Sequence, residues 1–282
     1  MIRETFVLFV RETKRWAGRR PVLVVSLVTP LFWVLLFGKS FNIINMVNLE
    51  NLELPQEYYA IAVKIVEVIR LRIFEIFGSQ DYFTYMASGM LVVITLFQGT
   101  FSGASAIFDK RLGYMTRLMA APIRRESIYL AKVAASVFRA LLLSLILLMV
   151  AYIAGFKFKE GFTVLDLAAA VTVVVLISLT FTSIFMVLGF VADSPEALFS
   201  VANLVTLPLM FTSSALFPVD QMPEWLRLIA SVNPLTYASD LVRFFLIGKT
   251  VSDPWLTLAP LAAGSLITLI VGMKISVRAL EA

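Results

Sequence analysis

The sequence predicts an all-α, polytopic membrane protein with six transmembrane helices, and two observations predict it: the composition and the lengths of the apolar runs. Of the 282 residues, 60% are hydrophobic and 15% are charged, against roughly 45–50% and about 25% in soluble proteins. A helix needs about 17–25 mostly apolar residues to cross a bilayer. The predicted spans are the six runs 21–37, 82–108, 133–156, 167–192, 197–217 and 255–273. We expect them to form a single transmembrane domain over residues 1–282.

The composition also excludes several kinds of chemistry. The chain has no cysteine and no histidine, which removes disulfides, thiolate nucleophiles and the commonest metal ligand and general base. A membrane-embedded hydrolase would need Ser with His, a His-Glu-x-x-His motif or an intramembrane Asp pair, and the sequence has none of these. We therefore expect no catalytic residue, no metal site and no enzyme activity on this chain.

The first 20 residues predict an amphipathic helix that lies in the headgroup layer. Phe6, Phe9 and Trp16 share one face of such a helix, and Lys and Arg side chains supply the charge. A signal peptide is the alternative, but no small-residue cleavage site follows Phe37.

Residues 38–81 form the longest polar stretch, and acidic residues outnumber basic ones in it. This excess places the stretch outside the cell. Residues 58–77 are too charged to span, because each charge at the centre of a span costs about 2.5–3.5 kcal/mol. We expect an interfacial helix along the outer leaflet, and a hairpin remains the alternative.

A basic insert at 109–132 separates two apolar runs. Six of its residues are basic, namely Lys110, Arg111, Arg117, Arg124, Arg125 and Lys132. A short basic loop is typical of the cytoplasmic side. Leu112, Met115, Leu118 and Met119 recur at helical spacing before Pro122. We expect a short helix at about 110–122 under the bilayer; the alternative is a solvated loop that only sets topology.

Residues within the predicted spans give two further expectations. Gly89, Gly99 and Gly103 allow close contact between helices. Arg139 lies in the third span. We expect its side chain to reach the inner headgroups, and a buried partner is the alternative.

The segment after the fifth span is broken by Pro218, Pro223 and Pro234, which cut it into pieces too short to cross. We expect two short helices, at about 224–231 and 235–247, that form a re-entrant pair closing the outer end. An ordinary surface loop is the alternative. The expected headgroup anchors are Trp225 and Tyr237. The charged residues expected to keep these pieces near water are Asp220, Glu224, Arg227, Asp240 and Arg243.

Two stretches of this sequence carry a family resemblance. The run around the basic insert and the run SPEALF to SDLVR, with its Leu-Pro-Leu, Phe-Pro, Met-Pro-x-Trp-Leu and Asn-Pro-Leu landmarks, resemble the membrane subunit of type-2 ATP-binding cassette (ABC) exporters of the multidrug type. The matching residues of the first run are Asp109, Gly113, Arg117, Leu118, Ala121, Pro122 and Arg124. Together the two stretches cover over half the chain. The sequence departs from the family at Arg111, where a second acidic residue is usual, and at Ser88, where proline is frequent.

The resemblance implies a coupling helix that docks on a separate cytoplasmic ATPase. The residues it assigns to this coupling are Asp109, Arg111, Gly113, Arg117, Leu118, Met119, Ala121, Pro122 and Arg124, with Asp193 and Glu196 in a second inner turn. The residues of the expected outer gate are Phe217, Pro218, Trp225, Asn233 and Pro234. The resemblance also implies a second permease copy, either identical or related. No cofactor is expected on this chain, since ATP and Mg would bind the ATPase.

Localisation and cargo follow from charge. The predicted inner segments hold more Lys and Arg than the outer ones, which predicts a plasma-membrane protein with both termini in the cytoplasm. The net charge of +5 indicates contact with membrane lipids and not with nucleic acid. Charge-poor spans favour export of a hydrophobic or amphipathic substrate, such as a drug or lipid. The alternatives are export of a glycan or lipid-linked polysaccharide, or an ion-coupled carrier, which would need more ionisable residues in its spans.

Overall fold

The computed structural model describes residues 1–18, 20–40, 56–79, 81–251 and 253–281, and within these ranges every regular element is a helix. The elements are α1 (Ile2–Ala17), α2 (Arg20–Ser40), α4 (Gln56–Phe77), α5 (Tyr82–Arg111), α6 (Tyr114–Ala120), α7 (Arg125–Ile153), α8 (Val164–Val191), α9 (Pro195–Phe211), η2 (Val219–Gln221), α10 (Glu224–Val232), α11 (Pro234–Ile247) and α12 (Pro254–Glu281). The predicted all-α class is confirmed.

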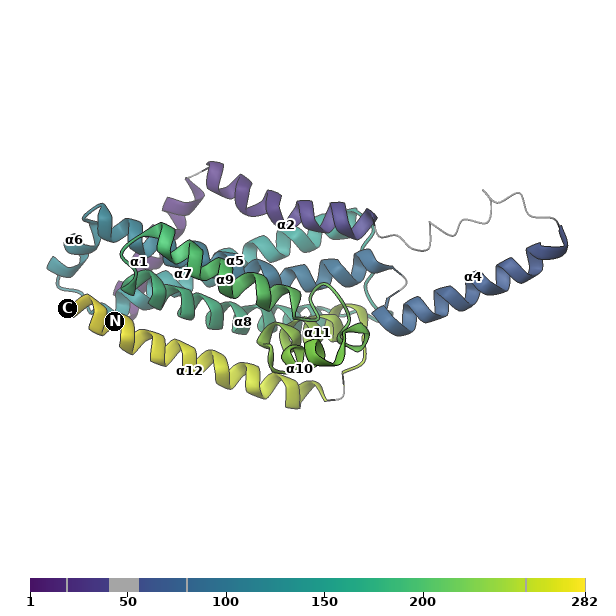
Figure 1. The fold of residues 1–282 in the computed structure, drawn as a ribbon. Coiled ribbons are helices and arrows are strands. Elements are labelled where there is room, and N and C mark those ends of the chain that lie inside the picture. Colours follow the sequence, from purple (N-terminus) through teal and green to yellow (C-terminus); the bar gives the residue numbers. More distant parts are fainter. Residues whose placement is uncertain (19, 41–55, 80, 252, 282) are drawn as a thin grey trace.

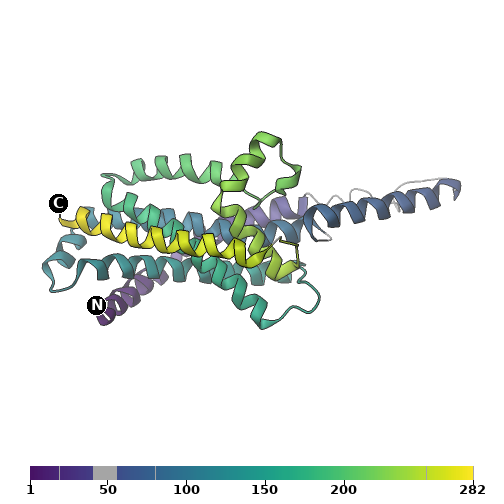
Figure 2. The ribbon, with the colours of Figure 1, turned by 90° about the horizontal axis from the view of Figure 1, so that it is seen from below.

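Long helices run side by side to form an elongated bundle with α5 at its centre (Figures 1 and 2). Helix α5 packs against α2, α7, α8, α9 and α11, whereas α12 lies on the outside against α7, α8 and α11. Within the described ranges, four stretches are long and apolar enough to cross a membrane: Ile61–Arg111, α7, α8 and α12. Several candidate membrane spans are therefore present.

Two helices account for the other predicted runs. Helix α2 covers the run 21–37. Helix α9 ends at Phe211, earlier than the predicted end of the run 197–217. It ends early because Ser213 turns the chain, its hydroxyl donating to the Met210 carbonyl at 2.8 Å.

The bundle has two distinct ends (Figure 1). Both termini and α6 lie at one end, here called the α6 end, and α10 and α11 lie at the other, the α11 end. The C-terminal end of helix α4 meets the bundle at the α11 end, and the rest of the helix projects away from the bundle (Figures 1 and 2). An interfacial helix or a hairpin was expected at 58–77, and the chain forms one helix there. Near the end of this helix, Phe77 packs on the rings of Tyr82 and Tyr85, with ring centroids 5.5 and 5.2 Å apart. Its position along the outer leaflet stays a prediction.

Glycines let α5 approach its neighbours closely, as predicted. A Cβ atom on Gly89 would lie 2.1 Å from the Ala215 carbonyl oxygen, and one on Gly103 would lie 2.3 Å from the Phe185 carbonyl oxygen. Gly189 of α8 meets Gly103 in the same way, at 2.2 Å from its carbonyl oxygen. Backbones this close exclude any side chain at the contact.

Helix α1 packs along α7, and its orientation differs in part from the predicted one. Phe9 packs edge-on against Phe138 of α7, with ring centroids 5.8 Å apart, and Trp16 packs on the main apolar cluster. Phe6, expected on the same face, is exposed. The helix instead buries Glu12 toward the bundle, where Lys132 of α7 and two arginines of α1 itself lie close to it.

Candidate functional site

The corner between α5 and α7 forms a short helix at the α6 end. Gly113 has a positive φ of 68°, a left-handed conformation that favours glycine, and it turns the chain from α5 into α6. Ala121 is extended at the other end of α6, as expected for a residue before proline. Three predicted residues, Gly113, Ala121 and Pro122, thus shape the two corners that hold this helix.

Helix α6 has a buried and an exposed face. Met115 is buried in an apolar cluster with Tyr129 and Phe190, and Leu118 packs partly against that cluster. Arg117 and Met119 are exposed. Of the predicted contact residues, Leu118 therefore faces the bundle in part, which the sequence spacing alone did not distinguish.

Asp109, which the resemblance assigns to coupling, does not belong to the exposed surface. Its side chain is buried, and it accepts hydrogen bonds from Arg15 Nη1 at 2.6 Å and from Lys132 Nζ. Glu12 Oε1 lies 3.8 Å from Lys132 Nζ and 3.2 Å from Arg11 Nη1. These five residues form a charge cluster, buried at Glu12, Asp109 and Lys132, that joins α1, α5 and α7.

Sequence reasoning missed this cluster because it treated 109–132 as one charged insert outside the membrane. Helix α7 begins at Arg125, so Lys132 is two turns inside a helix. Lys132 and Glu12 are far apart in sequence. The sequence signal that could have placed Lys132 inside a helix is the helical pattern, which continues through Lys132 into the apolar run.

Two further contacts fix α1 to the region of α6. The Arg11 guanidinium lies 3.6 Å from the centroid of the Tyr114 ring, in cation–π geometry. Glu4 Oε2 accepts hydrogen bonds from the Arg124 backbone N–H at 3.2 Å and the Ser127 hydroxyl at 2.9 Å. These hydrogen bonds, the Arg124 N–H first, hold the pKa of Glu4 below its ordinary value. Glu4 thus caps the start of α7 from another helix.

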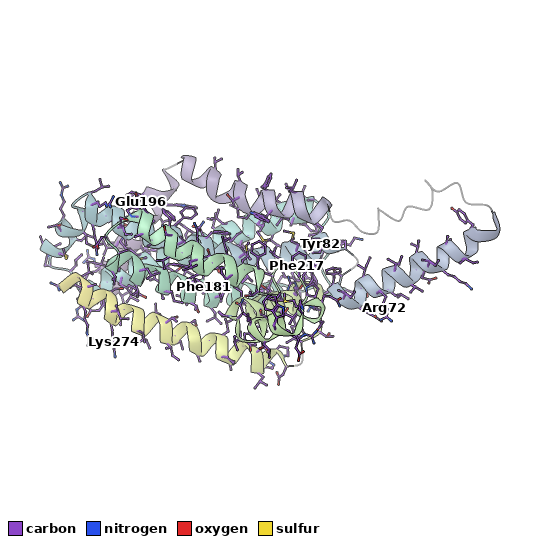
Figure 3. The ribbon with its side chains drawn as sticks, viewed as in Figure 1. Arg72, Tyr82, Phe181, Glu196, Phe217 and Lys274 are labelled. Carbon is purple, nitrogen blue, oxygen red and sulfur yellow. The ribbon has the colours of Figure 1, made fainter. Side chains whose placement is uncertain are left out.

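The second predicted inner turn lies at the same end. Arg111 Nη2 donates to the Asp193 carbonyl oxygen at 3.3 Å, and Lys110 Nζ donates to the Phe190 carbonyl oxygen. The side chains of Asp193 and Glu196 are exposed, and Figure 3 shows Glu196 at the α6 end. The structure therefore brings the end of α5 next to the 193–196 turn.

Arg139 does not reach out of the bundle, so the expectation of a headgroup contact is corrected. Its side chain is 8% exposed and lines a cavity of about 250 Å³ together with Glu12 and Arg15. Helix α1 covers it, which the sequence did not indicate. Within the described ranges, no group of three or more carboxylates is placed to hold a metal ion.

At the α11 end, the broken segment forms α10 and α11 with Asn233 between them. Asn233 Oδ1 accepts from the Leu235 N–H at 2.9 Å and so caps α11, which begins at Pro234; its Nδ2 donates to the Leu209 carbonyl at 2.8 Å. Pro218 precedes η2. Phe217 stacks on Tyr82 with ring centroids 6.2 Å apart (Figure 3).

The remaining residues of this segment differ in exposure. Trp225 is 65% exposed on α10. Arg243 was expected near water, but it is fully buried. Its guanidinium donates to the carbonyls of Ala215 at 2.8 Å and Tyr85 at 3.2 Å, and to the Ser214 hydroxyl at 3.3 Å. Those acceptors compensate the burial of its charge.

Comparison with known proteins adds a family. Residues 3–247 match the family of ABC-2 type transporters. The chain is 30% identical over 251 residues to "Putative transport permease ycf38" of Cyanophora paradoxa. The aligned region covers 86% of this chain and 74% of that protein. It is 30% identical over 178 residues to "Nodulation protein J" of Rhizobium leguminosarum bv. trifolii, covering 62% and 66%. It is 23% identical over 230 residues to "Probable doxorubicin resistance ABC transporter permease protein DrrC" of Mycobacterium tuberculosis, covering 78% and 80%.

Proposed function

Since this chain belongs to the ABC-2 type transporter family, we propose that it is the membrane subunit of an exporter driven by ATP hydrolysis on a separate cytoplasmic ATPase. The observation that carries the proposal is α6. It is a short helix at the end of the bundle where both termini lie, with Arg117 and Met119 exposed and Met115 anchored in the core (Figure 1). An exposed helix that is anchored to the spans in this way can be displaced when a bound partner changes conformation.

The contacts around α6 would transmit a displacement of this helix to the membrane-spanning helices. Met115 packs on α7 and α8 through Tyr129 and Phe190. Tyr114 holds Arg11 of α1. Because side chains this closely packed move together, a displacement of α6 would be passed to several helices at once.

The test of this route is charge reversal at Arg117. Arg117→Glu should leave expression and the basal ATPase rate of the reconstituted complex intact, because the side chain is exposed, and should abolish the stimulation of ATP hydrolysis by substrate. Arg278→Glu, an exposed change on α12 at the same end, is the matched control and should keep the stimulation. Normal stimulation in Arg117→Glu would show that α6 is not the coupling helix.

For the topology we propose six spans, with α2 and α9 added to the stretches through α5, α7, α8 and α12. The α6 end faces the cytoplasm with both termini, and the protein resides in the plasma membrane. The excess of Lys and Arg at that end supports this orientation. Two copies of the chain, or this chain and a related permease, would enclose the substrate path.

The α10–α11 pair is proposed as a re-entrant gate at the outer end. Its support is Trp225, exposed on α10, and the anchoring of α11 by Asn233 and Arg243. Cysteines at Trp225 in both copies, joined as a disulfide, should block export while ATP hydrolysis continues. Unchanged export with a complete cross-link would reduce the segment to a surface loop.

The cargo we propose is hydrophobic or amphipathic, of the drug or lipid kind. Its support is the scarcity of charge in the spans and the relative named for doxorubicin resistance. Stimulation of the reconstituted ATPase by a panel of amphipathic drugs and lipids tests it. Stimulation by a glycan alone would favour the alternative cargo.

A further inference from the structure

One wall of the cavity beside Arg139 is the Arg139 side chain itself, a cation that forms no ion pair with any described residue. Arg139 lies on α7, seven residues beyond Lys132, which is about 10 Å deeper along the helix. Its side chain is more than nine-tenths buried and lines a cavity of about 250 Å³ between α1, α5, α7 and α9. No hydrogen bond or ion pair joins its guanidinium to any described residue, unlike that of Arg243.

Neither of the neighbouring carboxylates forms an ion pair with Arg139. Glu12 also lines the cavity, but its Oε1 is already shared by Arg11 at 3.2 Å, Lys132 at 3.8 Å and Arg15 at 3.9 Å. Asp109 is held by Arg15 and Lys132. Four cations therefore surround two carboxylates, and a buried cation in excess is costly unless an anion or other acceptor meets it.

A second cavity adjoins the first. It has a volume of about 240 Å³ and shares the residues Gln98, Phe101 and Phe199 with the first. Its further lining includes Pro30 and Ile94. Ile94 precedes Gln98 by one helical turn of α5, so this cavity lies farther from the α6 end. Together they form a space that is cationic near the α6 end and largely apolar beyond it.

We propose that this double cavity binds an amphiphile with a phosphate-type anionic head, which Arg139 contacts, and an apolar chain, which lies along Phe101 and Phe199 toward Ile94. Gln98, buried in the wall of both cavities, offers an amide donor to the same head. The ligand comes either from the surrounding bilayer as an anionic phospholipid or from the exported cargo. The inference does not depend on the transport cycle, because binding alone tests it.

The experiment measures binding to the purified full chain in neutral detergent. The probe is phosphatidylglycerol with a fluorophore on its acyl chain, followed by fluorescence anisotropy; unlabelled phosphatidylglycerol, phosphatidylcholine and dodecyl phosphate compete with it. We expect phosphatidylglycerol to compete at least tenfold better than phosphatidylcholine. Arg139→Gln should weaken probe binding at least tenfold, and Arg139→Lys, which keeps the charge, should weaken it less. Arg278→Gln, exposed on α12, should bind as the wild type does.

Dodecyl phosphate distinguishes the two sources. Competition equal to that of phosphatidylglycerol would mean that a head and one chain suffice, as for a cargo, whereas competition by phosphatidylglycerol alone would identify a bilayer lipid; both outcomes support the site. Thermal unfolding guards against a folding defect: phosphatidylglycerol should raise the midpoint of the wild type and not that of Arg139→Gln. Equal affinity of both proteins for the probe, equal competition by phosphatidylcholine, or equal stabilisation of both proteins would overturn the proposal.

Discussion

At the scale of single residues, Arg243 shows how a buried cation holds an end of this bundle together. Its planar guanidinium donates in several directions at once, to the carbonyls of Tyr85 and Ala215 and to the Ser214 hydroxyl. It also lies 3.6 Å from the centroid of the Tyr85 ring. A lysine ammonium is a point donor and does not reproduce this fork. One side chain thus ties α11 to α5 and to the turn after α9.

Removing this guanidinium should therefore destabilise the fold. Arg243→Leu leaves buried acceptors without a donor, at about 1–3 kcal/mol each, so the free energy of unfolding should fall by roughly 3 kcal/mol or more. Denaturation of the purified protein in detergent measures it. The control is Arg278→Leu, an exposed arginine of α12, which should change the same quantity by about 0.5 kcal/mol or less. Equal losses in the two variants would contradict the assigned role.

The buried charge cluster gives a second prediction at this scale. Asp109→Asn leaves Arg15 and Lys132 without their shared carboxylate and should cost about 3–5 kcal/mol of unfolding free energy. Adding Lys132→Met should recover part of that loss, since it removes one of the two stranded cations. Asp193→Asn, an exposed carboxylate, is the control. A double variant whose loss equals the sum of the single losses would show that the two residues do not interact.

The burial of Arg243 and Asp109 could not be predicted from the sequence. Both were counted with the charges that stay near water, because one sequence shows which residues are charged but not which distant carbonyls or cations meet them. The left-handed turn at Gly113 and the helix cap at Asn233 were not predicted either, although both depend on immediate neighbours in the sequence.

At the scale of helices, the crossing of α5 and α8 depends on paired glycines. Gly103 and Gly189 face each other with their backbones in contact, and Gly99 approaches Phe181 of α8. Van der Waals packing drives association of helices in a bilayer, so small residues at the contact matter more than apolar area. Glycines in α5 were predicted to serve this purpose; their partner in α8 was not identified.

This crossing predicts opposite outcomes for two glycine substitutions. Gly189→Ala puts a Cβ 2.2 Å from a backbone oxygen, so the helices must move apart, at a cost of about 1–3 kcal/mol or more. Gly264→Ala adds a Cβ in open space on α12 and should be neutral or stabilising by up to about 1 kcal/mol. Thermal unfolding of both variants in one detergent provides the comparison. A stable Gly189→Ala variant would refute the close crossing.

Helix boundaries show where sequence signals suffice. The two short helices expected at about 224–231 and 235–247 are found at Glu224–Val232 and Pro234–Ile247, because Pro223 and Asn233-Pro234 are local breakers. The predicted third span starts at 133, and α7 itself begins eight residues earlier, at Arg125. No breaker lies between those positions, and charge was used as a boundary where the helix simply continues.

At the scale of the whole molecule, apolar helices lie in two different surroundings, the protein core and the periphery of the bundle. The most apolar window of the Ile61–Arg111 stretch is 78% buried in the protein, whereas that of α12 is 17% buried. Both are apolar because lipid tails and a protein core demand the same side chains. Hydropathy could therefore locate these segments, but it could not tell that α5 is central and α12 peripheral.

The last prediction concerns the orientation in the membrane, and α7 is the helix best suited to test it. Its 29 residues span about 43 Å, more than the roughly 30 Å of hydrocarbon. The exposed residues Leu112 and Glu160 lie before and after it. In the chain, which has no native cysteine, Glu160→Cys should react with an impermeant maleimide on intact cells. Leu112→Cys should react only after permeabilisation.

The third position tests the remaining crossings. Arg278→Cys, exposed near the end of α12, should behave as Leu112→Cys does, because an even number of crossings separates them when α7, α8, α9 and α12 all span. Its labelling on intact cells would remove one of those crossings. Labelling of Leu112→Cys and Glu160→Cys from the same side would mean that α7 does not cross. Reversal of all three patterns would put α6 outside, out of reach of any cytoplasmic ATPase, and the proposed coupling would fall with it.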